Sequence, residues 1–151
     1  MKQILLAITF LIVTSCSKND YETIDYVTKN EQEITDYIAT NNLTATRSNS
    51  GLYYVITEEG TGAQPTATST VTVAYKGSFI NGQLFDKSTD AGISFSLQRV
   101  IRGWTEGITY FKEGGKGLLL IPSHLAYGSY NYNGIPGGSV LIFEIHLISI
   151  N

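Results

Sequence analysis

The chain has 151 residues, of which 42% are hydrophobic and 11% aromatic, enough for one domain with a compact core. The formal net charge is −3 and the basic residues form no cluster, which argues against a nucleic-acid-binding surface. One cysteine and two histidines are too few for a disulfide framework or a zinc site, so we expect no metal and no other cofactor.

Residues 1–15 have the pattern of an export signal. A charged start at Lys2 precedes an apolar run over residues 4–13, which is too short to span a bilayer as a helix. The run ends in Val-Thr-Ser-Cys16, which resembles the bacterial lipobox, so Cys16 would carry lipid and anchor the protein in the cell envelope. Ser17 favours the outer membrane. The alternative is an ordinary signal peptide with an incidental cysteine.

Residues 16–50 are expected to form a tether and one short helix. Thr28 and Glu31 have the spacing of a capping box, and Asn41-Asn42 supplies a stop, so the helix is predicted over residues 28–41. Its apolar face consists of Ile34, Tyr37 and Ile38. Such a helix is either an appendage packed on the domain or a spacer, and it carries no evident chemistry.

The folded domain is expected over residues 51–151, with strands at 52–56, 70–79, 117–121 and 140–149. Apolar and polar residues alternate strictly in 70–79, which predicts a half-buried antiparallel strand, and Asn81-Gly82 indicates a tight turn after it. In the last strand the alternation directs one set of residues inward and another outward. The inward set is Leu141, Phe143, Ile145 and Leu147, and the outward set is Ile142, Glu144 and His146.

A short central helix is expected to follow the apolar run 93–97. Trp104, Ile108 and Phe111 recur at helical spacing, and Gly114-Gly115 would end the helix. Gly103 allows a sharp turn that delivers the indole into a core. A long loop rich in Gly, Tyr and Asn then covers residues 123–138. About five antiparallel strands and one short helix place the domain in the α+β class.

Seven short motifs in one order over about a hundred residues resemble the FK506-binding-protein (FKBP) type of peptidyl-prolyl cis-trans isomerase. Any one of them is weak, but seven in register are specific. They are Val71-Thr-Val-Ala-Tyr-Lys-Gly77, Gly82-Gln-Leu-Phe-Asp86, Val100-Ile-Arg-Gly-Trp-Thr-Glu-Gly107, Ile121-Pro122, Ala126-Tyr-Gly128, Gly134-Ile-Pro136 and Leu141-Ile-Phe143. The resemblance implies a curved antiparallel half-barrel sheet wrapped on the central helix, with an apolar pocket between them.

The resemblance also implies roles for particular residues. Trp104 would form the pocket floor, the backbone N–H of Ile101 and the hydroxyl of Tyr127 would donate to peptide carbonyls, and Asp86 would orient the bound amide. The walls would come from Tyr75, Phe85, Ile93, Phe95, Val100, Ile101, Ile135 and Phe143. Simpler explanations stay open: a strand-end carboxylate for Asp86, a barrel tyrosine for Tyr127, and core packing for Trp104, Val100 and Phe143.

Two positions depart from the family pattern. Ile93 stands where the family usually has an aromatic residue of a Phe-Xaa-Phe pair, and Tyr132 lies near where many members carry a histidine. These departures concern the catalytic rate and the affinity for macrolide drugs more than the fold.

Two functions fit this sequence. The first is an active isomerase that helps exported proteins fold, because uncatalysed prolyl isomerisation takes tens to hundreds of seconds. The second is a binding module or holdase that grips proline-containing segments without turnover. The expected partners are proline-containing polypeptides, FK506-like macrolides and, through Cys16, a membrane. All candidate pocket residues lie between Tyr75 and Phe143 in the sequence. Residues 17–50 are therefore expected to be dispensable for catalysis.

Overall fold

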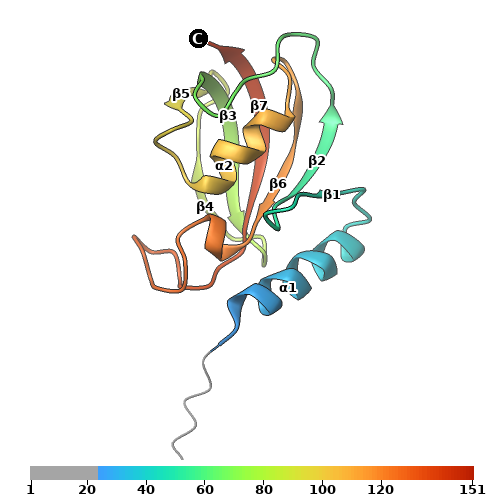
Figure 1. Ribbon diagram of the computed structural model, residues 1–151, viewed down its shortest axis with the longest axis vertical. Helices are drawn as coiled ribbons and strands as arrows, with labels where there is room; N and C mark the ends of the chain where they lie inside the picture. Colours follow the sequence, from blue (N-terminus) through green and yellow to red (C-terminus); the bar gives the residue numbers. More distant parts are fainter. Residues whose placement is uncertain (1–23) are drawn as a thin grey trace, which may run out of the picture.

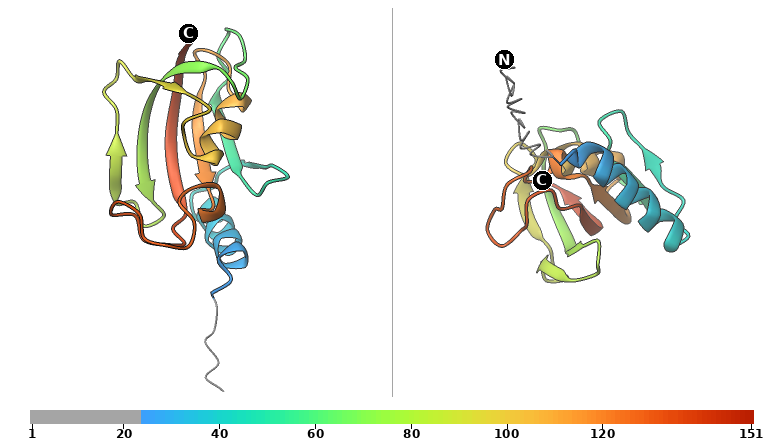
Figure 2. Two further views of the ribbon diagram at one scale, coloured as in Figure 1. Left: turned by 60° about the vertical axis from the view of Figure 1, so that its left-hand side comes forward. Right: turned by 90° about the horizontal axis from the view of Figure 1, so that it is seen from below.

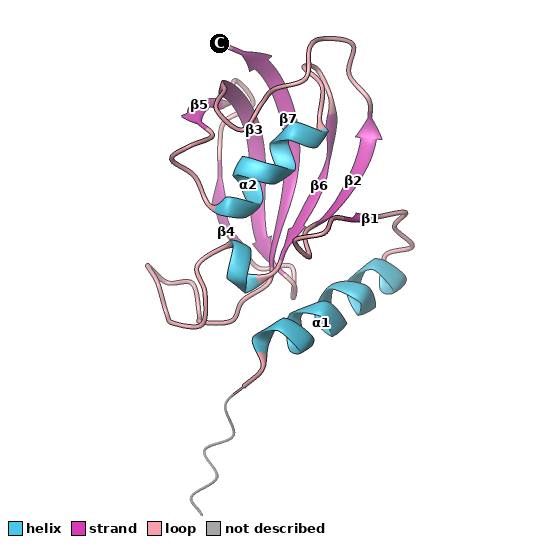
Figure 3. Cartoon of the chain, in the orientation of Figure 1, coloured by secondary structure: helices cyan, strands magenta, loops and turns pink. Residues whose placement is uncertain are grey.

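The computed structural model describes residues 24–151, so the predicted export signal and Cys16 lie outside the described residues. Within this range no helix has the length and apolar character needed to cross a membrane. The helices are α1 (Tyr26–Thr40) and α2 (Arg102–Gly107), with 3-10 turns at Ile108–Tyr110 and Ser123–Leu125. The strands are β1 (Thr46–Arg47), β2 (Tyr53–Glu58), β3 (Thr70–Phe79), β4 (Leu84–Lys87), β5 (Ile93–Ser96), β6 (Lys116–Ile121) and β7 (Leu141–Ile150) (Figures 1 and 3).

All strands join one antiparallel sheet in the order β1-β2-β6-β7-β3-β4, with β5 pairing β3. The predicted curved sheet is confirmed, but it has seven strands rather than about five, since β1, β4 and β5 are short additions at its edges. Figure 2 shows the sheet curving around α2. The turn after β3 forms as expected, with Gly82 at φ 84°, a conformation that glycine adopts without strain.

The inner face of the sheet packs against α2. Trp104, Ile108 and Phe111 are all buried there, as their spacing predicts. The helix approaches the sheet closely because it turns glycines toward β6; a Cβ added at Gly107 would lie 2.7 Å from Leu119 Cδ1. These contacts form the main hydrophobic core.

The central helix ends earlier than predicted. Phe111 already has an extended backbone, with φ −94° and ψ 153°, so the helical turns stop at Tyr110 rather than at Gly114-Gly115. The following N–H groups bond outside any helix: Glu113 N donates to Ala63 O at 2.9 Å, and Gly114 N to Leu147 O at 2.7 Å. Tertiary partners therefore replace the last predicted helical turn.

The outer face of the sheet has a second core under α1. Ile34 is fully buried against this face, where its neighbours include Tyr53, Leu120 and Ile142. Ile142 lies on this outer face, as the alternation predicts, but α1 covers this part of β7 and leaves Ile142 only 2% exposed. Of the two alternatives for the helix, an appendage packed on the domain is the one that the structure has.

The capping prediction for α1 is also wrong. The N-cap is Asp25, whose Oδ1 accepts hydrogen bonds from the N–H groups of Val27 at 3.0 Å and Thr28 at 3.3 Å. Glu31 does not reach back to the helix start; it accepts instead from Arg47 Nε at 3.0 Å and Tyr53 Oη at 2.7 Å. An aspartate three residues before Thr28 supplies a stronger cap than the hydroxyl, and Glu31 serves to hold α1 against β1 and β2.

Candidate functional site

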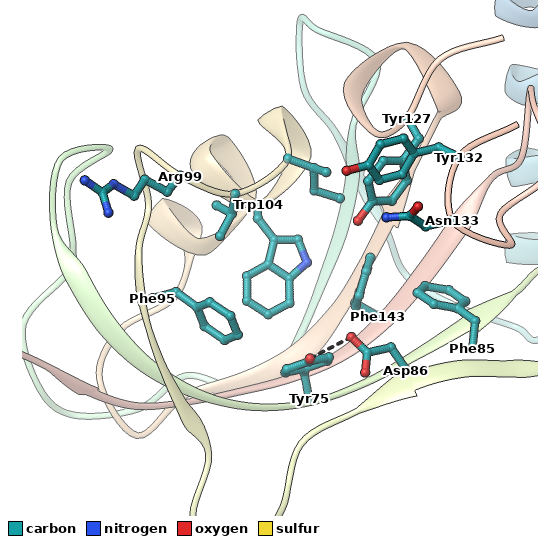
Figure 4. Close-up of a pocket in the computed structure, with 12 residues that line it drawn as sticks. Tyr75, Phe85, Asp86, Phe95, Arg99, Trp104, Tyr127, Tyr132, Asn133 and Phe143 are labelled. Atoms are coloured by element: carbon teal, nitrogen blue, oxygen red, sulfur yellow. Dashed lines mark hydrogen bonds between the residues drawn. The ribbon is translucent and has the colours of Figure 1, made fainter. Parts of the chain in front are cut away.

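A cavity of about 520 Å³ opens between α2, the inner face of the sheet and the loop 123–138 (Figure 4). Its lining is mostly aromatic and comes from segments far apart in the chain. Twelve residues line it: Tyr75, Phe85, Asp86, Phe95, Arg99, Val100, Ile101, Trp104, Tyr127, Tyr132, Asn133 and Phe143. A concave apolar site with a few polar groups at its rim is typical of a ligand-binding pocket.

Trp104 lies at the centre of an aromatic cluster. Its ring meets those of Tyr75, Phe95 and Phe143 edge to face, with centroids 5.2, 5.4 and 5.3 Å apart. These T-shaped arrangements are the favourable ones for aromatic pairs. The indole is only 4% exposed, and its Nε1 has no hydrogen-bond partner among the described residues. An unpaired buried donor is uncommon in native proteins, and this one lies within the aromatic cluster of the cavity.

Gly77 of β3 makes room for two of the pocket walls. In the sheet, Gly77 pairs with Asp86 of β4 on one side and with Phe143 of β7 on the other. A Cβ at this position would lie 2.7 Å from Phe85 Cζ and 2.9 Å from Phe143 Cε1. Because glycine has no side chain, the Phe85 and Phe143 rings can pack edge to face with centroids 5.6 Å apart.

The acidic group of the pocket sits at its exposed rim. Asp86 Oδ2 accepts a hydrogen bond of 2.7 Å from Tyr75 Oη, drawn as the dashed line in Figure 4. Burial, followed by this hydrogen bond to the carboxylate, raises the pKa of Tyr75. The phenol therefore remains a protonated donor, and it fixes one Asp86 oxygen while the other stays free for a ligand.

Ile101 brings a backbone donor to the cavity. It precedes α2 with an extended backbone, at φ −60° and ψ 150°, and its carbonyl accepts from Trp104 N at 2.9 Å. Within residues 24–151 no group accepts a hydrogen bond from the Ile101 N–H. Because Ile101 is the N-cap of α2 and also lines the cavity, its main-chain N–H is available to a ligand.

The loop 123–138 supplies the remaining wall. Tyr127 stacks on Tyr132 with ring centroids 4.9 Å apart and planes 12° apart, and burial raises the pKa of Tyr127. Tyr132 and Ile135 pair across a two-residue turn in which Asn133 and Gly134 have φ of 45° and 84°. This turn places Asn133 at the cavity. An Asn-Gly pair is a strong turn signal, and it could have located Asn133 from the sequence.

Nine of the eleven sequence-predicted site residues line the cavity together, and two do not. Ile93 begins the edge strand β5, where its side chain is 43% exposed outside the cavity. Ile135 is buried and lines a neighbouring hollow of about 410 Å³ that shares Phe85 and Asp86 with the cavity. Three further residues line the cavity. Arg99 and Asn133 were not predicted from the sequence, and Tyr132 was singled out only because it departs from the family pattern. No local pattern marks Arg99.

The lining of the cavity limits its chemistry. It contains no serine, threonine, cysteine, lysine or histidine, so it has no serine or cysteine nucleophile paired with a histidine base. Among the described residues, no three His, Cys, Asp or Glu side chains gather into a metal site. The arrangement can hold an apolar ring against Trp104 and offer hydrogen bonds at the rim, which suits binding or conformational catalysis of a peptide.

Comparison with known proteins agrees with this geometry. The family model for FKBP-type peptidyl-prolyl cis-trans isomerase matches residues 61–148. The isomerase FkpA of Buchnera aphidicola subsp. Baizongia pistaciae is 50% identical over 108 residues, which cover 70% of this chain and 43% of that protein. FkpA of Escherichia coli K12 is 46% identical over 105 residues, covering 68% and 39%. The chain therefore spans about two fifths of the length of these relatives.

Solved structures show the same fold. The crystal structure of Escherichia coli FkpA aligns with a TM-score of 0.74 at 38% identity, over 83% of this chain and 61% of that one. A peptidyl-prolyl cis-trans isomerase from Pseudomonas syringae aligns with a TM-score of 0.75 at 31% identity, over 83% and 93%. Each structural alignment covers 83% of this chain, which is more than residues 61–148, the part that the family model matches.

Proposed function

Because this chain belongs to the FKBP-type peptidyl-prolyl cis-trans isomerase family, we propose that it catalyses rotation about Xaa-Pro bonds in polypeptides. The observation that carries the proposal is the aromatic cavity around Trp104, which has hydrogen-bonding groups at its rim. Rotation about an amide needs no covalent intermediate, so such a site is sufficient for it.

The reaction has a barrier of about 18–20 kcal/mol, because twisting the amide breaks its resonance. The twisted state has less charge separation than either planar form, so a water-poor apolar surround favours it. In this proposal the prolyl ring lies on Trp104 between Tyr75, Phe95 and Phe143. The cluster of edge-to-face rings supports such a seat, since its members hold one another in place.

The rim groups would orient the peptide. The Ile101 N–H and the Tyr127 hydroxyl donate to carbonyls of the substrate, and the Asp86 oxygen that Tyr75 leaves free faces the twisting amide. The unpaired state of the Ile101 N–H and the raised pKa of Tyr127 support these roles, because both groups remain available as donors near neutral pH. FK506-like macrolides, which present an apolar ring and carbonyl groups, would compete for the same cavity.

The proposed setting is the bacterial cell envelope. Cys16 would carry a lipid that anchors the protein, on the strength of the Val-Thr-Ser-Cys pattern, and Ser17 favours the outer membrane. The substrates there would be exported polypeptides whose folding waits for prolyl isomerisation.

The deciding experiment is refolding of a protein whose slow phase is limited by a proline bond, with and without this chain. We expect catalytic amounts of the chain to accelerate the slow phase, and an FK506-like macrolide to suppress the effect. Binding of proline peptides without acceleration would replace the isomerase with a holdase. Absence of both would refute the proposal.

A further inference from the structure

Asn30 of α1 is a buried polar side chain that contacts the pocket loop, although it lies outside the family match and far from the cavity in sequence. Its side chain is 0% exposed; within residues 24–151 only Ser123 joins it among the buried polar residues. Burying an amide is costly unless its hydrogen bonds are made. Those bonds are made here, and all but one go to a single loop.

Asn30 closes a ring of four hydrogen bonds at the base of the loop 123–138. Its Oδ1 accepts from Ser123 N at 2.9 Å, and its Nδ2 donates to Gly138 O at 2.9 Å. The loop completes the ring itself, because Gly128 N donates to Ser123 O at 2.8 Å and Gly138 N donates to Gly128 O at 2.8 Å. The side chain thus joins the two ends of the loop to each other.

The ring admits one orientation of the amide. If the Asn30 oxygen and nitrogen were exchanged, a donor would face the Ser123 N–H and an acceptor would face Gly138 O, so both bonds would be lost. The second Nδ2 hydrogen goes to Glu33 Oε2 at 3.0 Å on the same helix. Tyr26, also on α1, packs so closely on Gly138 that no Cβ would fit there. The start of α1 is therefore matched to the backbone of this loop.

The ring lies next to the cavity wall. Gly128, one of its members, directly follows Tyr127, and the loop between Gly128 and Gly138 carries Tyr132 and Asn133. The side chains of Tyr127, Tyr132 and Asn133 all line the cavity. Loop residues far from regular structure need such anchoring, because a small displacement of an orienting group lowers the rate strongly.

We infer that Asn30 is a positioning residue for the isomerase site: it fixes the base of the loop so that the Tyr127 hydroxyl stays at the cavity. The inference rests on the proposed function, and it assigns α1 a part in the activity beyond stabilising the fold.

The test compares Asn30→Ala with Glu31→Ala in the full chain. Glu31 is the next residue of α1, and it binds Arg47 and Tyr53, which take no part in the ring, so its loss removes contacts of α1 with β1 and β2 and keeps all four bonds of the ring. We expect Asn30→Ala to lower kcat/KM about tenfold or more for the folded fraction, and Glu31→Ala to stay within about twofold of wild type.

A spectroscopic readout makes the result independent of turnover. Trp104 is the only tryptophan and lines the same cavity as Tyr127, Tyr132 and Asn133 of the loop, so its quenching by acrylamide reports how open the cavity is. Quenching should rise in Asn30→Ala and stay unchanged in Glu31→Ala. Asn30→Asp serves if the alanine variant does not fold. It keeps the side-chain volume and the acceptor for Ser123 N but loses the donor to Gly138 O, so it should show the same fall in kcat/KM and the same rise in quenching that are expected of Asn30→Ala.

The outcomes separate the two proposals. If wild type turns over and both variants match it in kcat/KM and quenching, Asn30 has no positioning role and the proposed function stands. If wild type shows no turnover, the proposed function fails, and quenching alone decides whether Asn30 holds the loop. Should neither Asn30 variant fold, native hydrogen exchange of wild type decides: Ser123 and Gly138 amides that exchange as fast as exposed loop amides would overturn the inference.

Discussion

At the scale of single residues, mutation can separate a structural role of Asp86 from the orienting role that we propose for it. It accepts the hydrogen bond from Tyr75 Oη at 2.7 Å, which is a structural contact at the end of the hairpin formed by β3 and β4. It also presents a carboxylate oxygen at the rim of an otherwise apolar cavity. A structural role and an orienting role predict different effects on the rate.

We expect Asp86→Ala to lower kcat/KM about tenfold or more, because the amide loses its orienting group; tenfold corresponds to about 1.4 kcal/mol of transition-state stabilisation. The measurement is kcat/KM on a proline peptide, with the folded fraction determined by circular dichroism. Tyr75→Phe is the matched control, since it removes the same hydrogen bond and keeps the carboxylate. If Asp86→Ala retains the wild-type kcat/KM and loses only stability, Asp86 is a strand-end carboxylate and the apolar pocket is the whole catalyst.

At the scale of secondary-structure elements, α1 changes the character of the sheet. Without it the sheet would have one buried face, as antiparallel sheets often do. With it, β6 and β7 are buried on both faces: Leu119 and Phe143 pack inside, and Leu120 and Ile142 pack under α1. The expectation that residues 17–50 are dispensable was based on pocket residues alone, and this second core argues against it.

The contribution of α1 to stability can be measured with one substitution. Ile34→Ala should lower the free energy of unfolding by about 2–5 kcal/mol, because Ile34 is fully buried in the second core and its truncation leaves a cavity. Val27 lies on the same helix and is 62% exposed, so Val27→Ala should change stability by no more than about 0.5 kcal/mol. Urea denaturation of the three proteins checks this; equal midpoints would mean that α1 does not unfold together with the sheet.

At the scale of the whole molecule, the structure describes a folded unit from residue 24 onward, and the proposed anchor lies outside it. The cavity is formed entirely by residues 75–143. The proposed anchor and the cavity therefore belong to separate parts of the sequence, so mutation can test each one separately.

Substitution of the proposed lipid-bearing cysteine should change where the protein fractionates and leave its activity unaltered. We expect Cys16→Ser to release the protein from the membrane fraction or to leave it unprocessed, while the kcat/KM of the purified variant stays at the wild-type value. Membrane fractionation and mass spectrometry of the mature N-terminus provide the measurements. If the variant fractionates as wild type does and mass spectrometry finds no acyl chains on the wild-type protein, Cys16 is incidental to an ordinary signal peptide.

The sequence by itself determined the features that depend on local periodicity. The alternation in 70–79 predicts β3 with its observed bounds, and Asn81-Gly82 predicts the turn that follows, because strand alternation and turn conformation are set by neighbouring residues. Seven motifs in order predicted the family and contain eight of the residues that line the cavity; the ninth predicted residue, Phe95, lies between two motifs. These motifs could be recognised because each is short and continuous.

Only the tertiary structure decided which distant segments meet. The buried Ile142, the exposed Ile93 and the placement of Arg99 depend on what covers each face of the sheet, and alternation along one strand does not show this. The partners of Asn30 lie 93 and 108 residues away in the chain. A polar residue on a helix face is ordinarily solvated, and Asn30 differs because folding brings both ends of the pocket loop to it, where its amide replaces the water that the backbone would otherwise bind.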